Sequence, residues 1–323
     1  MAVCAFEGNS DMYGLGIRLG YYLQWYGGIF AAWFAPSETR ALRFTNGLFV
    51  AASFLALVIL TVGDVDSLHP VEVYIILLLM FGAYLSLIPI YLWRLLTQCD
   101  PYWDPTRYPL VIPGAVFANL HLLLLVGVLV YQYWFWFNRV PTLDRVNCQE
   151  YGFLFAKIRL NNKGFIAVNI LLYFFLGMVC LYIMWLKIRR AAGLPSPRGK
   201  RRTISRRHLI AHIELLGNLD TWIKIVVALT VTVATELVID WNGIENVNSL
   251  ASAGQTIPFL IGLGSVIRIF YVYWFPDDRD DDSDGGSYYS SDDRRSHRRP
   301  ISVDHLPMAQ PPNVRRPSRT YHR

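Results

Sequence analysis

The sequence has few charged residues, and the scarcity is concentrated in long stretches of the chain. Asp, Glu, Lys and Arg make up 17% of the 323 residues, whereas hydrophobic residues make up 54%. A soluble domain usually carries about 25% charged residues. Long apolar blocks also alternate with short polar ones. This composition excludes an ordinary soluble globular domain and favours a chain that crosses a lipid bilayer.

Motifs of the common enzyme classes are lacking as well. The sequence has no His-Glu-x-x-His metalloprotease helix, no Gly-x-Ser-x-Gly nucleophile turn, no phosphate-binding glycine loop and no Cys-x-x-Cys pair. The acceptor pattern Asn-x-Ser/Thr is absent too, so natural N-glycosylation cannot report on topology. We therefore expect no enzyme activity, no cofactor and no metal site.

Seven apolar segments are long enough to cross a bilayer as helices. The hydrocarbon core, about 30 Å thick, needs about 20 helical residues. Helices satisfy their backbone polar groups inside lipid, and these runs are continuous, unlike the alternating strands of a barrel. The segments are Leu15–Ala35, Phe44–Val62, Val71–Trp93, Leu110–Phe137, Phe165–Leu186, Trp222–Ile239 and Ile257–Phe275. We predict an all-α, polytopic transmembrane helical bundle of about seven spans over residues 1–275.

Two of these segments carry features that disturb a regular span. The first contains Arg18, Gln24 and the pair Gly27-Gly28, and Gly costs roughly 1 kcal/mol relative to Ala inside a helix. A helix lying in the membrane interface is the alternative for this segment, and it would leave six spans. In the third segment, Pro89 removes a backbone donor, so we expect a kink there.

The distribution of positive charge predicts the orientation, because Lys and Arg are retained on the cytoplasmic side of a membrane. With the N-terminus outside, the cytoplasmic loops hold most of the basic residues. These are Arg40, Arg43, Arg94, Arg107, Lys187, Arg189, Arg190, Arg198, Lys200, Arg201, Arg202, Arg206 and Arg207. The outer loops hold Arg139, Arg145, Lys157, Arg159 and Lys163. We therefore predict an outside N-terminus and an inside C-terminus, in the plasma membrane or an endomembrane.

The four cysteines fall in different places in this topology. Cys99 lies in a cytoplasmic loop and Cys180 within the fifth segment, while Cys4 and Cys148 both lie outside. Disulfides persist in oxidising compartments outside the cytosol. A Cys4–Cys148 disulfide between the N-terminus and the large outer loop is one hypothesis, and two unpaired thiols are the other.

Ionisable side chains inside a span are costly and often functional. Arg18 and Glu236 each lie about four residues, or roughly 6 Å, below the outer end of a segment, so an ion pair between them is allowed. His121 lies near the midplane of the fourth segment, and Asn119 precedes it by two positions. In one interpretation these residues line a polar cavity for a ligand, ion or proton. In the other, Arg18 and Glu236 form a structural pair and His121 hydrogen-bonds within the bundle.

A basic cluster lies in the loop over residues 187–219. It consists of Lys200, Arg201, Arg202, Arg206 and Arg207, with Thr203 and Ser205 among them. Such a cluster attracts anionic lipid headgroups at about 1 kcal/mol per basic residue, and phosphorylation of Ser205 would weaken the attraction. The alternative is a signal that only retains the loop in the cytoplasm. Nucleic acid is not expected as a partner, because both ends of the loop are tethered to spans.

The segment over residues 276–323 is rich in Asp, Arg, Ser and Pro and poor in apolar residues. It buries too little apolar surface to fold alone, so we expect a disordered cytoplasmic tail. Ser302 and Ser318 each follow a pair of arginines and are candidate sites for a basophilic kinase. A cytoplasmic protein is the partner expected for such a tail.

Four segments carry a family resemblance. They are Gly14–Pro36 (GLGIRLGYYLQWYGGIFAAWFAP), Thr45–Ala56 (TNGLFVAASFLA), Cys99–Pro109 (CDPYWDPTRYP) and Cys148–Leu160 (CQEYGFLFAKIRL). In these segments the chain resembles a family of multi-pass integral membrane proteins of filamentous fungi that has no assigned activity. The resemblance covers the chain to about residue 275. It implies a hydrophobic bundle and a fungal origin, but no catalytic or binding residues.

The predicted architecture also resembles that of G-protein-coupled receptors. The chain departs from that family in two motifs, because Trp93-Arg94 stands where Asp/Glu-Arg-Tyr would end the third span, and the last span lacks Asn-Pro-x-x-Tyr. We predict a receptor-like or sensory membrane protein. A membrane scaffold or lipid-interacting protein and a small-solute transporter are the alternatives. A transporter would show broken helices or inverted repeats, and the sequence has no convincing internal repeat.

Overall fold

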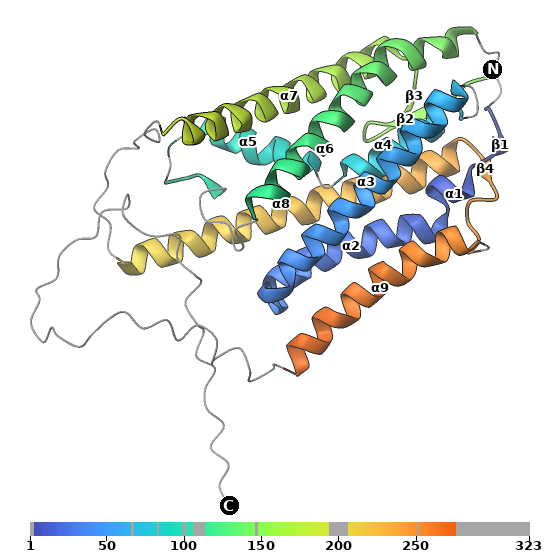
Figure 1. The fold of residues 1–323 in the computed structure, drawn as a ribbon. Coiled ribbons are helices and arrows are strands. Elements are labelled where there is room, and N and C mark those ends of the chain that lie inside the picture. Colours follow the sequence, from blue (N-terminus) through green and yellow to red (C-terminus); the bar gives the residue numbers. More distant parts are fainter. Residues whose placement is uncertain are drawn as a thin grey trace, which may run out of the picture.

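The chain folds as an all-α helical bundle, as Figure 1 shows. The computed structural model describes residues 3–65, 68–82, 84–98, 100, 102–105, 114–145, 148–193, 206–250 and 252–275. The helices are α1 (Ser10–Tyr13), α2 (Leu15–Phe34), α3 (Thr39–Gly63), α4 (Pro70–Phe81), α5 (Leu87–Leu96), α6 (Ala115–Trp134), α7 (Lys163–Ala191), α8 (Arg206–Trp241) and α9 (Ala253–Trp274). The helical bundle predicted from the sequence is confirmed, and the predicted tail over residues 276–323 lies outside the described residues.

Within the described residues, five helices are long and apolar enough to cross a membrane. They run over Pro36–Gly63, Val116–Asp144, Lys163–Arg189, Ala211–Trp241 and Ala253–Trp274. The pair formed by α4 and the segment Tyr84–Leu96 adds a sixth if it counts as one span, although it is bent by 64°. Such lengths and compositions fit a membrane protein. Helix α2 falls outside this set, so it accounts for the difference from the seven predicted spans.

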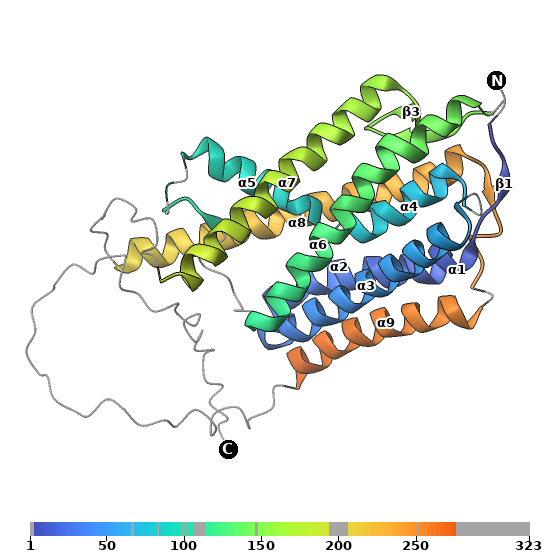
Figure 2. The same cartoon turned by 45° about the horizontal axis from the view of Figure 1, so that its top comes forward.

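Helix α2 lies in the interior of the bundle, which explains its more polar composition. It packs against α3, α8 and α9, and it runs alongside α3 and α9 in both Figure 1 and Figure 2. Eleven of its 20 residues are buried, including Arg18 and Gln24. A helix that faces protein on most sides can carry polar residues that a lipid-facing helix cannot. Arg18 and Gln24 are therefore accommodated in α2 because of its position among the other helices.

Three glycines allow α2 and α9 to approach closely. Gly16 and Gly20 are four residues apart on α2, in the small-xxx-small pattern of tightly packed membrane helices. A Cβ on Gly20 would lie 2.8 Å from the carbonyl oxygen of Pro258, and one on Gly16 would lie 2.3 Å from that of Gln255. Gly262 of α9 faces the backbone of Gly20 in return. The α2–α9 contact therefore depends on the absence of side chains at these positions.

Helix α4 is completely buried and ends in a sharp bend. All 12 of its residues are buried, and the bend occurs between Phe81 and Tyr84. A Cβ on Gly82 would lie 2.6 Å from the indole ring of Trp25, so this ring occupies the space at the bend. The kink expected at Pro89 is therefore wrong in position. Pro89 lies in the first turn of α5, where a backbone donor has no partner within the helix and proline is tolerated.

Two short sheets lie at one end of the bundle, which we call the disulfide end. Strands β1 (Phe6–Glu7) and β4 (Ile244–Glu245) pair in parallel, and strands β2 (Tyr151–Phe153) and β3 (Lys157–Arg159) form an antiparallel hairpin. We call the opposite end, where α9 finishes at Trp274, the tail end. The hairpin lies in the connection between α6 and α7.

Candidate functional site

A disulfide ties together three separate parts of the chain at the disulfide end. Cys4 and Cys148 are bonded, with their Cα atoms 5.1 Å apart. Val3 forms a β-bridge with Gln149, and β1 pairs with β4. The structure thus brings together the two cysteines that the sequence suggested as partners. It also joins the N-terminal strand to the connections that precede α7 and α9.

The structure also brings Arg18 and Glu236 together. Arg18 Nη1 donates to Glu236 Oε2, and the Arg18 side chain is 0% exposed. Arg18 Nη2 donates to Asn248 Oδ1 at 2.6 Å and to the Val247 carbonyl oxygen at 3.1 Å. The Tyr22 hydroxyl donates to Glu236 Oε1 at 2.8 Å. The buried guanidinium therefore has a counter-ion and neutral acceptors, as a charge inside a membrane protein requires.

Two of these partners were not found by the sequence analysis. Tyr22 lies four residues after Arg18, which places both side chains on one face of α2. That spacing was a usable signal. Asn248 lies in the connection between α8 and α9, and no local pattern relates it to Arg18, which is 230 positions away in sequence.

A hollow of about 330 Å³ lies beside this ion pair. Its walls include the carboxylates of Glu236, Asp240 and Glu245, together with Asn248 and Ile244. The side chain of Glu236 is 45% exposed, whereas that of Arg18 is fully buried. One carboxylate therefore contacts both a buried cation and an open acidic hollow. Such a hollow attracts cations, because its lining carries negative charge without a basic side chain.

The acidic hollow does not have the residue pattern of a metal site. In the part of the chain that the structure describes, no group of three or more His, Cys, Asp or Glu side chains could hold a metal ion. An organic cation fits the lining better, since it needs negative charge and hydrogen-bond acceptors rather than a fixed coordination geometry.

A second buried carboxylate cluster fixes the start of α4. Glu72 accepts from the Tyr13 hydroxyl at 2.7 Å, from the Asn9 amide at 2.9 Å and from the His69 amide at 2.7 Å. The last of these contacts is half of a capping box, which the spacing His69-x-x-Glu72 could have indicated. Glu150 accepts from the Val71 amide at 2.8 Å. These bonds hold the N-terminus of α4 against the segments that precede α2 and α7.

Protonation of His69 makes the contacts of this cluster depend on pH. Its Nδ1 lies 3.4 Å from Glu150 Oε1, and the Glu150 side chain is only 1% exposed. The hydrogen bond to Glu150 raises the pKa of His69 above its usual value, and burial opposes the effect in part. The sequence analysis did not single out His69, because no span contains it.

His121 and Asn119 have different contact partners. His121 packs against the ring of Tyr84 with centroids 5.0 Å apart, and its Nδ1 lies 3.4 Å from the Tyr84 hydroxyl. Asn119 is exposed and accepts from Lys187 Nζ at 2.7 Å. Residues two positions apart in a helix point to nearly opposite sides, about 200° apart. The two side chains therefore make separate contacts, and the contact between His121 and Tyr84 agrees with the alternative in which His121 hydrogen-bonds within the bundle.

At the tail end, the structure describes part of one loop, whereas several residues predicted as sites are not described. Tyr102 stacks on His212 of α8, with ring centroids 3.7 Å apart, and Arg94 pairs with Asp104 at 3.1 Å. These contacts hold the described residues of this loop against α5 and α8. The remaining predicted sites lie outside the described residues or side chains: Lys200, Arg201, Arg202, Thr203, Ser205, Arg206, Arg207, Ser302 and Ser318.

Comparison with known proteins adds no relative. No protein-family model, no curated protein and no solved structure matches this chain. Function is therefore argued from the geometry of the disulfide end.

Proposed function

We propose that this chain is a receptor-like, sensory membrane protein that binds a small organic cation in the acidic hollow. The observation that carries the proposal is the double contact of Glu236, which lines the hollow and also neutralises the buried Arg18. An ammonium group bound in the hollow would share the Glu236 carboxylate with Arg18. Occupancy would thereby change the electrostatic environment of a fully buried residue near the disulfide end.

The proposed topology has α2 as a true span, seven spans in total, and the disulfide end outside. The Cys4–Cys148 disulfide supports this orientation, because disulfides persist in oxidising compartments. Arg40, Arg94 and Lys187 lie at the opposite end, in agreement with the retention of basic residues in the cytoplasm. The hollow then opens to the exterior or to the lumen of an endomembrane compartment.

The packing of α2 on α9 offers a way for binding in the hollow to affect the cytoplasmic side. Arg18 contacts the α8–α9 connection through Val247 and Asn248, and α2 packs closely on α9 through Gly20. A change in the Arg18–Glu236 contact would act on the position of α9 relative to α2. Helix α9 leads directly into the tail, which is the proposed contact for a cytoplasmic protein partner.

The test is binding of spermidine, a polyamine probe, to the full chain in nanodiscs. We expect saturable binding that raises the melting temperature. Asp240→Asn and Glu245→Gln should each weaken it roughly tenfold, since a hydrogen bond to a charged group contributes about 1.5–3 kcal/mol. Asp144→Asn is the matched control, because Asp144 is an exposed acid on another connection and binds Asn161. Equal effects in all three variants, or no binding, would contradict the proposal.

A transporter is the second candidate, and the bent α4–α5 pair favours it. Broken helices at the centre of a bundle are typical of transporters, where the break lies next to the substrate. Uptake of labelled spermidine into proteoliposomes distinguishes the two functions. A receptor binds the probe without net uptake, whereas a transporter accumulates it. A scaffold that contacts anionic lipids through the 187–219 loop would do neither.

A further inference from the structure

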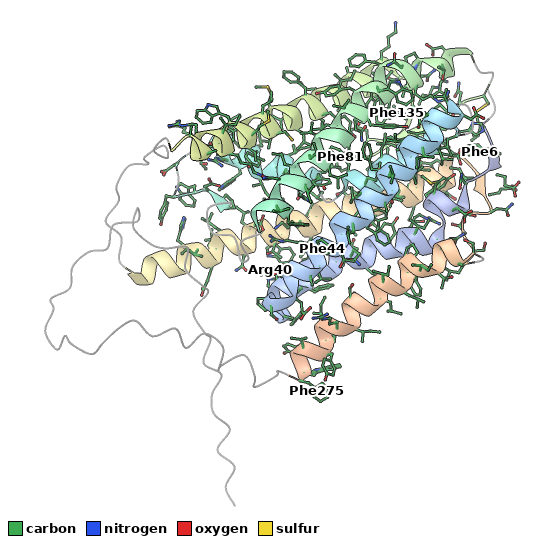
Figure 3. The ribbon with its side chains drawn as sticks, in the orientation of Figure 1. Phe6, Arg40, Phe44, Phe81, Phe135 and Phe275 are labelled. Atoms are coloured by element: carbon green, nitrogen blue, oxygen red, sulfur yellow. A yellow bond between two sulfur atoms is a disulfide. The ribbon has the colours of Figure 1, made fainter. Side chains whose placement is uncertain are left out.

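A second hollow lies at the tail end, separate from the proposed cation site. It has a volume of about 440 Å³, within the range of roughly 300–1,000 Å³ that small-molecule sites occupy. Its charged residues are Arg40, Arg43, Arg268 and Glu38. Figure 3 shows Arg40 and Phe44 near the start of α3, at the end of the bundle opposite to Phe6. The lining therefore has an excess of positive charge.

Among the residues that the structure describes, two of the three arginines have no counter-ion of their own. Arg268 forms a two-point ion pair with Glu38, with Nε–Oε2 at 2.8 Å and Nη2–Oε1 at 3.2 Å. Arg40 and Arg43 form no ion pair or hydrogen bond with any residue that the structure describes. Asp220 of α8 is near enough to Arg43 to act on it electrostatically, but its carboxylate is bound to Lys224. A ligand that binds here should supply negative charge.

Backbone dipoles add to the positive potential. The helix that contains α3 is continuous from Pro36, because the 3-10 turn Pro36–Glu38 leads directly into Thr39, and α6 begins at Ala115 without a side-chain cap. A helix N-terminus carries about half a positive elementary charge. Arg40 lies four residues after Pro36, near the N-terminal end of its helix, where the dipole disfavours a positive side chain. An anion between the two helix starts would relieve this repulsion and bind both arginines.

The apolar part of the hollow points to the source of that anion. Phe44 and Phe117 line the hollow and pack against each other with tilted rings, their centroids 5.9 Å apart. Above Phe44, which is 52% exposed, α3 presents Leu48 and Leu55, which are also exposed. A headgroup bound by Arg40 and Arg43 would thus have an apolar helix face beside it for its acyl chains.

We propose that this hollow binds the phosphate group of an anionic phospholipid in the cytoplasmic leaflet. Arg40 and Arg43 bind the phosphate oxygens, and the chains lie along the exposed face of α3 above Phe44. The proposal is independent of the cation site, because the two hollows share no residue and lie at opposite ends of the bundle. It also concerns a different cluster from the basic loop around Arg201.

The experiment uses delipidated full-length protein in a maltoside detergent, titrated with dioctanoyl phosphatidic acid. We expect saturable binding that the double variant Arg40→Gln/Arg43→Gln weakens by roughly 100-fold, because two charge-assisted bonds are lost. The double Lys variant keeps the charges and should retain part of the affinity. Arg189→Gln, at the same end on α7, and a triple Gln variant at Lys200, Arg201 and Arg202 are the matched controls.

Two further outcomes decide the source of the anion and the location of the site. Glycerol 3-phosphate that binds as tightly as the lipid would overturn the lipid and leave a soluble phosphate site. An affinity unchanged in the Arg40/Arg43 double variant, or reduced equally in the Arg189 and triple-loop controls, would overturn the site itself. Melting temperatures of all variants show that each protein is folded, so a lost signal reports on binding.

Discussion

Arg18 carries a permanent charge into a position where no water reaches its side chain. It is tolerated there because Glu236, Val247 and Asn248 supply acceptors from α8 and the following connection. Removing one partner of a buried pair usually costs about 3–5 kcal/mol, since the other charge is left uncompensated. The pair is therefore a point at which single changes affect the whole bundle.

We predict that Arg18→Gln and Glu236→Gln are coupled. Glu236→Gln should lower the free energy of unfolding by roughly 3–5 kcal/mol, whereas the double variant should lose less than the sum by about 1–3 kcal/mol. Unfolding in mixed micelles measures both values. Glu214→Gln, an exposed acid on the same helix, should change stability by less than about 0.5 kcal/mol. Additive effects of the two single variants would exclude the pair.

We predict that protonation of His69 stabilises the disulfide end. The folded-state pKa of His69 lies above the unfolded value, first because of the hydrogen bond to Glu150. This stabilisation is fully present below the unfolded pKa of about 6.5 and is lost as pH rises through the raised folded pKa. The melting temperature should fall from pH 5.5 to pH 8.5 by more in the native protein than in His69→Gln. Parallel pH profiles would contradict this assignment.

At the scale of single residues, the sequence predicted the Arg18–Glu236 pair but not the further hydrogen-bond partners of these two side chains. Arg18 and Glu236 were identifiable because a charge in a span needs a partner at the same depth. Asn248 was not identifiable, because only the closure of the α8–α9 connection brings it to Arg18. The different directions of Asn119 and His121 follow from helix periodicity alone, so they could have been predicted.

At the scale of elements, α2 and α9 are held together by backbone contact rather than by interlocking large side chains. Gly16, Gly20 and Gly262 leave no room for a Cβ on the contacting faces. Close approach of this kind replaces the hydrophobic driving force that is missing between helices in lipid. The contact explains how a helix with Arg18 and Gln24 is held inside the bundle.

We predict opposite effects of two glycine substitutions on the same helix. Gly20→Ala should destabilise the bundle by roughly 1–3 kcal/mol, because its Cβ would lie 2.8 Å from the backbone of Pro258. Gly28→Ala meets nothing within 4 Å and should stabilise α2 by up to about 1 kcal/mol. Thermal unfolding of both variants makes the comparison. A destabilised Gly28→Ala, or a neutral Gly20→Ala, would contradict the packing.

The break between α4 and α5 shows where element prediction from sequence fails. Pro89 was the visible signal for a kink, yet α5 starts at Leu87 and accommodates Pro89 in its first turn. The bend lies between Phe81 and Tyr84, and the ring of Trp25 from α2 fills the space beside the backbone of Gly82. Gly82 alone is a weak signal, and the contact with Trp25 exists only in the folded bundle.

At the scale of the whole molecule, the two ends differ in chemistry. The disulfide end has buried carboxylates, a disulfide and an acidic hollow. The tail end has a hollow lined by arginines. This difference between the two ends agrees with the proposed topology, in which one end faces an oxidising exterior and the other an anionic inner leaflet. Composition predicted the helical bundle, whereas the orientation inferred from the charges stays a prediction. The arginine-lined hollow could not be predicted, because its residues come from α3, α6 and α9, far apart in sequence.

The central claim is that α2 spans the membrane, so that the N-terminus and the tail lie on opposite sides. The native chain has no Asn-x-Ser/Thr acceptor, and an introduced acceptor therefore reports topology without background. One acceptor is placed in a short extension before Met1, one in the tail near Ser302, and one near Cys148 as a positive control. We predict glycosylation of the first and third acceptors but not of the tail. An unmodified N-terminus beside a modified Cys148 region, or a glycosylated tail, would contradict the seven-span account.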